Sequence, residues 1–501
     1  MSEETTQRPV AIPGIAAPAW QRLLPSWPWI VGLAAMLRAL GSPLALLHDP
    51  DTYMHIAVGR WMLTHRALPT ADPFSYTMAG AHWAPSEWLG EIILAAVYRA
   101  SSWGGVVVLT AACFGAALGL LTWFLLRRLE PLPAVIAALA GAVLVLPHLL
   151  ARSHVLALPL MVLWCGALIA ARDDEQGPPW PLLPVIVLWA NLHASFLFGI
   201  ALAGYLGGEA ALYPATGARR ADEVHRWGLF AIAAVGASLV NPNGVTALVQ
   251  PFRLMAMPAL QSGFGEWLPA NFAEFPALEA WLLAALALGF AAGARPRWTR
   301  IVLVAGLAHM ALAHVRHADL LGLVSPLALA AALGPRLAAL TRPAAGSPLL
   351  QSAARLARPM QLPGLALVLA LGVAVSLPLL LRPVDRSADA VTPQAALAAA
   401  KRLDLTGPVF NSEAFGGYLI FSGVPVFIDG RIELYGNDFL AAYLAAERGD
   451  TAALQGLLDH YHIAWALLQT GSPIVAAFDR LPGWRRVYTD GQAVIDVREQ
   501  P

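Results

Sequence analysis

Long apolar runs constrain the fold of this chain more than any other feature. Eleven of them approach the length that a helix needs to cross a bilayer, about 20 residues at roughly 1.5 Å each. The sequence therefore predicts an α-helical polytopic membrane protein with about eleven spans. These cover residues 27–47, 103–126, 132–150, 153–171, 178–194, 196–214, 227–242, 277–293, 300–315, 317–334 and 363–382.

Composition narrows the class further. Hydrophobic residues make up 58% of the 501 residues and charged residues only 13%. This composition excludes a disordered chain and a protein that binds nucleic acid through a basic surface. Charged residues become denser after residue 382. We therefore divide the chain into a cytoplasmic N-terminal tail (1–26), a transmembrane domain (27–382) whose first outer loop is 48–102, and a soluble domain (383–501).

Arginine placement predicts the orientation in the membrane. Fifteen arginines fall on one side of the predicted spans and seven on the other, where the loops are longer. By the positive-inside rule the first side, with the N-terminus, is cytoplasmic, and residues 383–501 lie outside. The cytoplasmic set is Arg8, Arg22, Arg127, Arg128, Arg172, Arg219, Arg220, Arg226, Arg295, Arg297, Arg300, Arg336, Arg342, Arg355 and Arg358. The outer set is Arg60, Arg66, Arg99, Arg152, Arg253, Arg316 and Arg382.

The first outer loop opens with a pair of acids. Asp49 and Asp51 form a D-x-D directly after the first apolar run, and His55 follows one helical turn later. Two carboxylates this close repel each other, and a divalent cation such as Mg or Mn relieves that repulsion through hard oxygen ligands. The alternative is a helix cap. Acids at the membrane boundary are costly, however, which favours a functional pair at Asp49 and Asp51.

The same loop holds two amphipathic segments, 53–65 and 85–99. Their apolar and aromatic positions predict helices lying in the membrane interface. Glu87 and Glu91 lie one turn apart on the second segment, and we keep them, with His55, as accessory or acceptor-binding candidates.

Further polar residues lie on the outer side at the ends of spans. A guanidinium can bind a phosphate with two parallel hydrogen bonds, so Arg152 and Arg316 are candidates to hold the phosphate of a donor, with His193 and His317 beside them. Arg316 is favoured because His317 and Asp319 are its neighbours. The alternative is that both arginines snorkel to the interface. Glu266, in the loop 241–276, is a further catalytic candidate.

These motifs resemble the GT-C superfamily of multi-pass glycosyltransferases, which includes oligosaccharyltransferase catalytic subunits and protein mannosyltransferases. Most of the chain is also similar to a group of bacterial membrane proteins that share DPDTYMHIAVGRWML, ADPFSYT, EWLGE, LWANLH and FNSEAFGGYLIFSGVPVFIDGR. The resemblance implies a multi-pass protein of the bacterial inner membrane. It also implies a polyprenyl-phosphate-linked sugar donor and a first-loop acid that serves a metal or acts as base.

The sequence departs from oligosaccharyltransferases in two places. Their W-W-D-Y-G run for peptide acceptors is replaced by Glu413-Ala414-Phe415-Gly416-Gly417-Tyr418, and there is no second D-x-D in the next outer loop. The acceptor is therefore open: a glycolipid, a polysaccharide or a protein.

The C-terminal domain reads as a small α/β sandwich. Helices are expected at 393–403, 413–421, 436–447, 451–460 and 473–480, and strands at 407–411, 425–429, 463–468, 485–489 and 493–498. Asp429 and Arg431 follow a predicted strand, the usual place for ligand groups in such sheets, and are acceptor-binding candidates.

Two functions remain open at this point. The first is a membrane glycosyltransferase with Asp49, Asp51 and Glu266 as catalytic residues. The second is a non-catalytic membrane protein, a transporter or envelope-assembly partner. Transporters place charges near mid-bilayer and often repeat their halves. Here the acids gather at the outer boundary and no repeat is evident, which favours the enzyme. The oligomeric state is not indicated.

Overall fold

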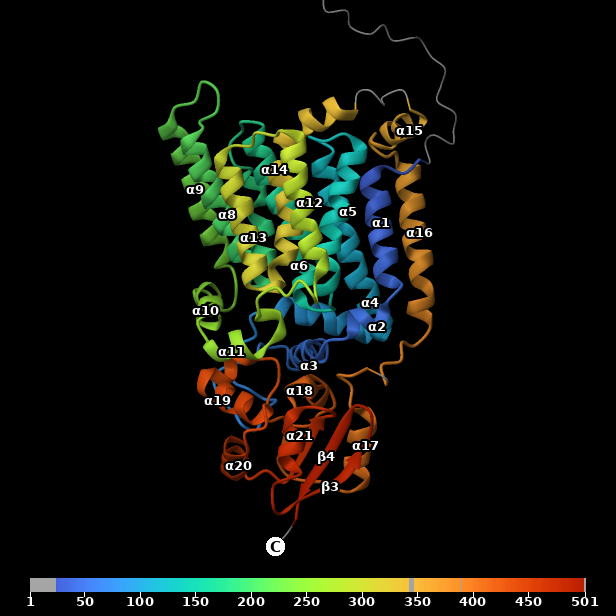
Figure 1. The fold of residues 1–501 in the computed structure, drawn as a ribbon, viewed down its shortest axis with the longest axis vertical. Helices are drawn as coiled ribbons and strands as arrows, with labels where there is room; N and C mark the ends of the chain where they lie inside the picture. Colours follow the sequence, from blue (N-terminus) through green and yellow to red (C-terminus); the bar gives the residue numbers. More distant parts are fainter. Residues whose placement is uncertain (1–23, 342–346, 388, 500–501) are drawn as a thin grey trace, which may run out of the picture.

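The chain folds into a helical bundle and a C-terminal α/β domain, joined through a layer of short helices (Figure 1). The computed structural model describes residues 24–341, 347–387 and 389–499. The predicted tail 1–26 falls almost wholly outside the described residues, as do Arg8, Arg22 and Arg342.

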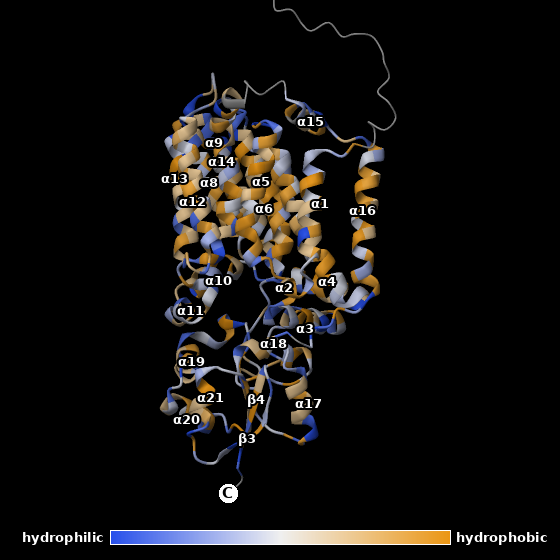
Figure 2. Ribbon diagram, turned by 45° about the vertical axis from the view of Figure 1, so that its right-hand side comes forward, coloured by the Kyte–Doolittle hydropathy of each residue, from blue (hydrophilic) through white to orange (hydrophobic). Residues whose placement is uncertain are grey.

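The bundle contains the apolar helices. Figure 2 shows that apolar residues dominate this part and that polar residues gather in the layer next to it. Five helices of the described chain are long and apolar enough to cross a membrane, and five shorter apolar helices accompany them, as expected for a multi-pass membrane protein. The number of spans stays a prediction. The bundle helices are α1 (Trp27–Leu40), α4 (Trp88–Leu125), α5 (Pro131–Val145), α6 (Ser153–Asp173), α7 (Leu183–Leu192), α8 (Phe196–Leu212), α9 (Arg220–Ser238), α12 (Pro276–Ala292), α13 (Trp298–Ala313), α14 (Ala318–Thr341) and α16 (Leu362–Leu381).

The first apolar run is not one helix. α1 ends at Leu40, and α2 (Pro43–Leu47) begins after Gly41 and Ser42. Pro43 disfavours a helical conformation at Ser42 and has no amide hydrogen to continue the helix, which accounts for the break. Arg38, inside the first apolar run, is exposed, and its guanidinium donates to the Ser42 hydroxyl at 3.2 Å.

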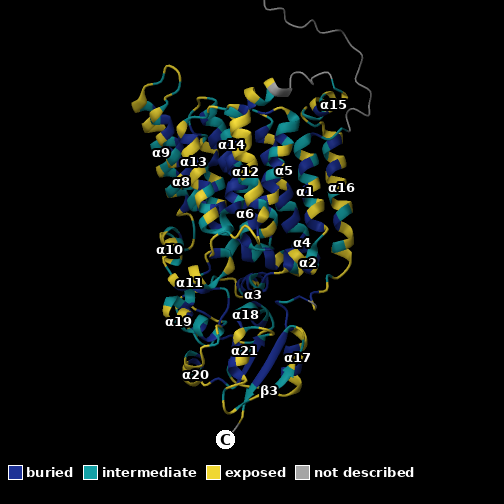
Figure 3. Cartoon of the chain, in the orientation of Figure 1, coloured by how far each residue is buried: buried dark blue, intermediate teal, exposed yellow. Residues whose placement is uncertain are grey.

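The layer between the two parts is built from outer-loop helices. It comprises α2, α3 (Pro50–His65), α10 (Thr246–Met255) and α11 (Pro258–Gly263) (Figure 1). We expected segment 53–65 to lie along the membrane interface. Instead α3 packs between α4 and the C-terminal helix α18 (Glu413–Phe421), and most of its side chains are buried (Figure 3). Gly59 lies against the Glu91 backbone and Gly417 against the Pro50 backbone, so a side chain at either glycine would clash.

The second amphipathic segment is continuous with a bundle helix. Most of segment 85–99 forms the first turns of α4, which then bends at Ser101 and Ser102. These two serines leave the helical conformation, and Ser102 has a positive φ of 52°. The polar start of α4, with Glu87 and Glu91, packs against α3 on the near side of this kink.

The C-terminal domain holds a four-stranded sheet in the order β1-β2-β4-β3. β1 is parallel to β2, and the other two neighbouring pairs are antiparallel. The α/β interpretation and nearly all predicted elements are confirmed. The elements are α17 (Gln394–Arg402), β1 (Val409–Asn411), α18, α19 (Ile432–Glu447), α20 (Thr451–His460), β2 (Trp465–Gln469), α21 (Pro473–Phe478), β3 (Trp484–Thr489) and β4 (Ala493–Arg498). The remaining short elements are η2 (Leu146–His148), η3 (Trp180–Leu182), η4 (Gly265–Trp267), η5 (Val315–His317) and α15 (Pro348–Leu356).

The predicted strand 425–429 is wrong. This segment lies outside the sheet and forms a single bridge with the first outer loop, where the amide of Val426 donates to the Phe74 carbonyl. The Asn411 side chain satisfies the amide of Phe427 and the carbonyl of Ile428. Buried backbone groups need partners of some kind, and here a side chain and a distant loop supply them in place of a neighbouring strand.

Candidate functional site

The two acids of the D-x-D begin helix α3. Asp49 is the N-cap residue, and its carboxylate accepts a hydrogen bond from the Asp51 amide at 2.8 Å. Pro50 occupies the first helical position, where no amide hydrogen is needed. The cap interpretation is thus correct for Asp49, although it accounts for only one of its two oxygens. Asp49 is 4% exposed, so its second oxygen needs a partner as well.

Arg152 supplies that partner and holds the acids of the site together. It is the N-cap residue of α6, directly after the turn that leaves α5. Its Nε lies 2.9 Å from Asp49 Oδ2, its Nη2 donates to Asp51 Oδ2, and its Nη1 donates to Glu266 Oε2 at 3.2 Å. Each nitrogen therefore faces a different carboxylate. This arrangement brings together three of the predicted catalytic acids and one of the predicted phosphate-binding arginines.

Arg316 lies on the far side of Glu266. Its Nη1 donates to Glu266 Oε1 at 3.0 Å, and the guanidinium lies 4.4 Å from the ring centroid of Trp267. The short helices η4 and η5 place these residues opposite each other. The Arg316 side chain is 26% exposed, and its guanidinium makes no other hydrogen bond within the described chain. Arg316 therefore keeps donors free for a ligand, whereas Arg152 hydrogen-bonds through both terminal nitrogens and its Nε lies 2.9 Å from Asp49 without hydrogen-bond geometry.

A second polar group adjoins Asp51 through His55. The His55 ring lies 3.4 Å from Glu91 and 3.7 Å from Glu87, and Glu87 in turn lies 3.6 Å from His193. Trp88 Nε1 donates to Asn191 at 2.8 Å, which ties the same turn of α4 to the end of α7. The structure thus brings His55, Glu87, Glu91 and His193 together, as a network beside the acids. His317 is not part of it, because its Nδ1 faces the Met310 carbonyl at 3.4 Å.

Burial and neighbouring charges change how these groups titrate. Burial raises the pKa of Asp51 to about 6, against the lowering effect of Arg152. Burial also raises the pKa of Glu87 to about 7. For His55 burial acts in the opposite direction, but the hydrogen bond with Glu91 and the charge of Glu87 outweigh it and raise the pKa to about 9. At neutral pH, therefore, His55 carries a positive charge beside an ionised Asp51.

The C-terminal domain contacts the site by its backbone. Gly430 lies against the Asp51 carboxylate, so a side chain at this position would have to displace that carboxylate. Its neighbours Asp429 and Arg431, expected to bind an acceptor, are instead fully engaged with each other. Arg431 donates from Nε and Nη2 to the two oxygens of Asp429, at 2.8 and 2.7 Å, and from Nη1 to Asp72 at 2.6 Å. Both residues are 2% exposed or less, which makes this group a clamp between two domains.

Sequence reasoning missed two residues. Asp72 completes the clamp, and its carboxylate also accepts from the amides of Phe74 and Ser75. An aspartate that accepts from the amides two and three residues later is a recognisable turn signal, but it does not reveal a partner 359 residues away. Glu413 begins α18, and burial together with the charge of Asp51 raises its pKa to about 8. In the sequence, the only indication of Glu413 is that it begins the stretch that replaces the W-W-D-Y-G run of oligosaccharyltransferases.

A divalent metal at Asp49 and Asp51 does not fit these side chains. No group of three or more His, Cys, Asp or Glu residues in the described part of the chain could hold a metal ion. The two carboxylates point at one guanidinium, which occupies the position between them.

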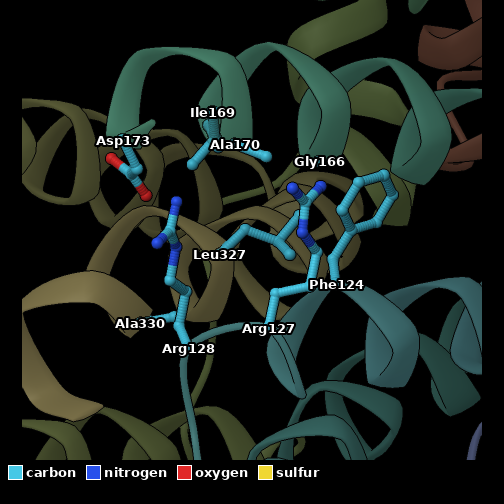
Figure 4. Close-up of a pocket in the computed structure, with 9 residues that line it drawn as sticks. All are labelled: Phe124, Arg127, Arg128, Gly166, Ile169, Ala170, Asp173, Leu327 and Ala330. Carbon is cyan, nitrogen blue, oxygen red and sulfur yellow. The ribbon is translucent and has the colours of Figure 1, made fainter. Parts of the chain in front are cut away.

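The opposite end of the bundle also carries charged residues, and they pair with one another around a small pocket. Arg128 and Asp173 point toward one another in a small pocket there, shown in Figure 4, that is lined by Phe124, Arg127, Arg128, Gly166, Ile169, Ala170, Asp173, Leu327 and Ala330. Nearby, Glu209 is fully buried and paired with Arg300 at 2.9 Å. These charged groups join α4, α6, α8 and α13 at the ends that lie far from the C-terminal domain, and we interpret them as structural.

Several solved structures are similar to this chain. The oligosaccharyltransferase AglB from Archaeoglobus fulgidus, in complex with an inhibitory peptide and a dolichol-phosphate, matches with a TM-score of 0.55 and 12% identity, over 88% of this chain and 69% of that one. The apo form of the Archaeoglobus fulgidus oligosaccharyltransferase matches with a TM-score of 0.48 and 13% identity, over 87% of this chain and 69% of that one. ArnT from Cupriavidus metallidurans, bound to undecaprenyl phosphate, matches with a TM-score of 0.47 and 14% identity, over 93% of this chain and 97% of that one.

The fold is therefore similar to that of AglB, as expected from the resemblance, and this similarity is the one that carries the argument. At 12% identity the likeness extends to the fold alone. Neither a protein-family model nor a curated protein sequence matches the chain.

Proposed function

We propose that this protein transfers a glycosyl group from a polyprenyl-phosphate-linked donor to an acceptor on the outer face of the bacterial inner membrane. The observation that carries the proposal is the grouping of Asp49, Asp51 and Glu266 with Arg152 and Arg316 between the bundle and the C-terminal domain. The AglB-like fold supports it, because that protein was solved with a dolichol-phosphate and a peptide.

Asp51 is the proposed general base. The acceptor hydroxyl gives its proton to the Asp51 carboxylate while its oxygen bonds to the anomeric carbon of the donor. The bond between that carbon and the phosphate oxygen breaks, and the polyprenyl phosphate leaves with the bonding electrons. Asp49 and Arg152 orient Asp51, and Glu266 links Arg152 to Arg316. A base positioned in this way contributes roughly 10²- to 10⁴-fold to such a transfer.

Arg316 is the proposed donor-phosphate residue. Its unpaired nitrogens and its position directly before α14 suit a lipid phosphate that is partly desolvated. Glu413 and the turn around Gly430 would face the acceptor, since both adjoin Asp51 from the C-terminal domain. The acceptor is a glycolipid, a polysaccharide or a protein.

The phosphate role predicts that Arg316→Lys weakens the binding of a polyprenyl phosphate by roughly 10- to 100-fold. A point charge cannot replace the planar fork, and a charge-assisted hydrogen bond contributes about 1.5–3 kcal/mol. The measurement is a binding titration of the purified protein with a short-chain polyprenyl phosphate. Arg253→Lys, an exposed outer-side control, should bind as the unchanged protein does. Equal affinity in both variants would leave Arg316 as an interfacial anchor only.

The base role predicts a pH dependence. Asp51 accepts a proton only when ionised, so kcat/KM should fall as the pH drops through about 6, the value to which burial raises the Asp51 pKa. His55→Gln removes a neighbouring positive charge that stabilises the ionised carboxylate. The fall in kcat/KM should therefore occur at a higher pH in this variant. The pH–rate profiles of the two proteins provide the test. If the acidic fall in kcat/KM stays at the same pH in His55→Gln, the group that titrates is not the Asp51 carboxylate beside His55.

The proposed location predicts an orientation in the membrane. A reporter that is active only outside the cytoplasm should be active when fused after Arg382 and silent when fused at Gly217. The expectation rests on the uneven distribution of arginines. The reverse pattern would place the whole site on the cytoplasmic side.

A further inference from the structure

Arg152 fills the position that a divalent cation would take between the two acids of the D-x-D. Nε faces Asp49 at 2.9 Å, Nη2 donates to Asp51, and Nη1 donates to Glu266 at 3.2 Å. The three carboxylates come from two separate loops, and the guanidinium comes from a third segment at the start of α6. A single guanidinium therefore forms an ion pair with one oxygen of each of the three acids.

The surroundings hold Arg152 in this position. The Asp49 carboxylate is fixed by the Asp51 amide at 2.8 Å, and the Asp49 and Arg152 side chains are 5% and 19% exposed. Removing either partner would leave a buried charge without compensation, which is costly in a poorly solvated site. Glu266 is held from its other oxygen by Arg316 at 3.0 Å. The guanidinium is thus part of a connected network.

We propose that Arg152 is a resident cation that takes the place of a divalent metal at Asp49 and Asp51, so that this site binds no metal ion. Its consequence for catalysis depends on the proposed function. A divalent ion coordinated by Asp51 would compete with the proton that a base must accept. A single arginine charge neutralises the repulsion between the acids and leaves the second Asp51 oxygen, which lies beside Gly430, outside the ion pair.

The experiment measures Mn²⁺ binding directly, by electron paramagnetic resonance on the purified full chain. The unchanged protein should show no saturable Mn²⁺ site. Arg152→Gln frees both carboxylates and should gain one site, which the double variant Asp49→Asn with Arg152→Gln should lose again. Arg316→Gln is the matched control, since this arginine contacts Glu266 but neither acid of the D-x-D, and it should gain none.

Two results would overturn the proposal. One is a Mn²⁺ site in the unchanged protein that disappears in Asp49→Asn, because a metal would then displace the arginine. The other is a folded Arg152→Gln protein that gains no site. Thermal melting separates a folding defect from this second result: the midpoint of Arg152→Gln should fall and rise again with Mn²⁺, while that of the unchanged protein should not respond. None of these readouts depends on glycosyl transfer, so they remain decisive even if the proposed function is wrong.

Discussion

Asp51→Asn should reduce glycosyl transfer by roughly 10²- to 10⁴-fold, the range that a positioned general base contributes. Asparagine keeps the shape of the side chain but cannot accept the acceptor proton. The measurement is transfer from a synthetic polyprenyl-phosphate sugar by purified protein, with the folded amount fixed by gel filtration. Asp49→Asn should keep the helix cap, because asparagine ranks with aspartate at this position, yet it should also lose transfer, since it weakens the ion pair with Arg152.

Asp385→Asn is the matched control. Asp385 accepts a hydrogen bond from the amide two residues on, Ser387, at 2.8 Å, just as Asp49 does from Asp51, but it is exposed, lies between α16 and α17, and forms no ion pair with any described residue. This variant should transfer at the unchanged rate. Full activity in both Asp49→Asn and Asp51→Asn would reduce the pair to a helix cap and favour the non-catalytic alternative.

Arg431→Met should lower the free energy of unfolding by about 3–5 kcal/mol, the cost of leaving buried acids without their cation. Asp429 and Asp72 would both lose their partner, and neither is more than 4% exposed. Tyr435, which donates to Asp429 at 2.7 Å, cannot replace a charge. The C-terminal domain should then separate from the first outer loop at a lower temperature. Thermal melting, followed by proteolysis of the linker near residue 387, measures this loss.

Arg498→Met serves as its control. Arg498 pairs with Asp459 at the surface, where the two side chains are 37% and 57% exposed, and such pairs contribute about 0–1 kcal/mol. Its melting midpoint should stay close to that of the unchanged protein. A similarly small effect in Arg431→Met would show that other contacts, such as Thr77 with the Phe427 carbonyl at 2.7 Å, hold the domains together.

Local patterns predicted the secondary structure well. Apolar runs and alternating segments located nearly every helix of the bundle and the strands β1, β2, β3 and β4, because both signals depend on neighbouring residues. Segment 425–429 has the composition of a strand, but its partners are Asn411 and a loop some 350 residues earlier. The run at 27–47 differs, because its break follows from a proline within the run itself, Pro43.

The D-x-D, the arginines at span ends and Glu266 were identifiable from the sequence, since charges near lipid are costly and stand out. Their roles were not. The sequence marked both Arg152 and Arg316 as phosphate-binding candidates, but tertiary structure surrounds the first with three carboxylates and leaves the second with one. Asp429 and Arg431 look like ligand groups at a strand end, but they form an ion pair with each other, and Arg431 also pairs with Asp72. Hydropathy and local periodicity decide which segments fold and roughly where they end. Which charged group neutralises which is decided only when loops distant in sequence meet, because the energy of a buried charge depends on its neighbours in space.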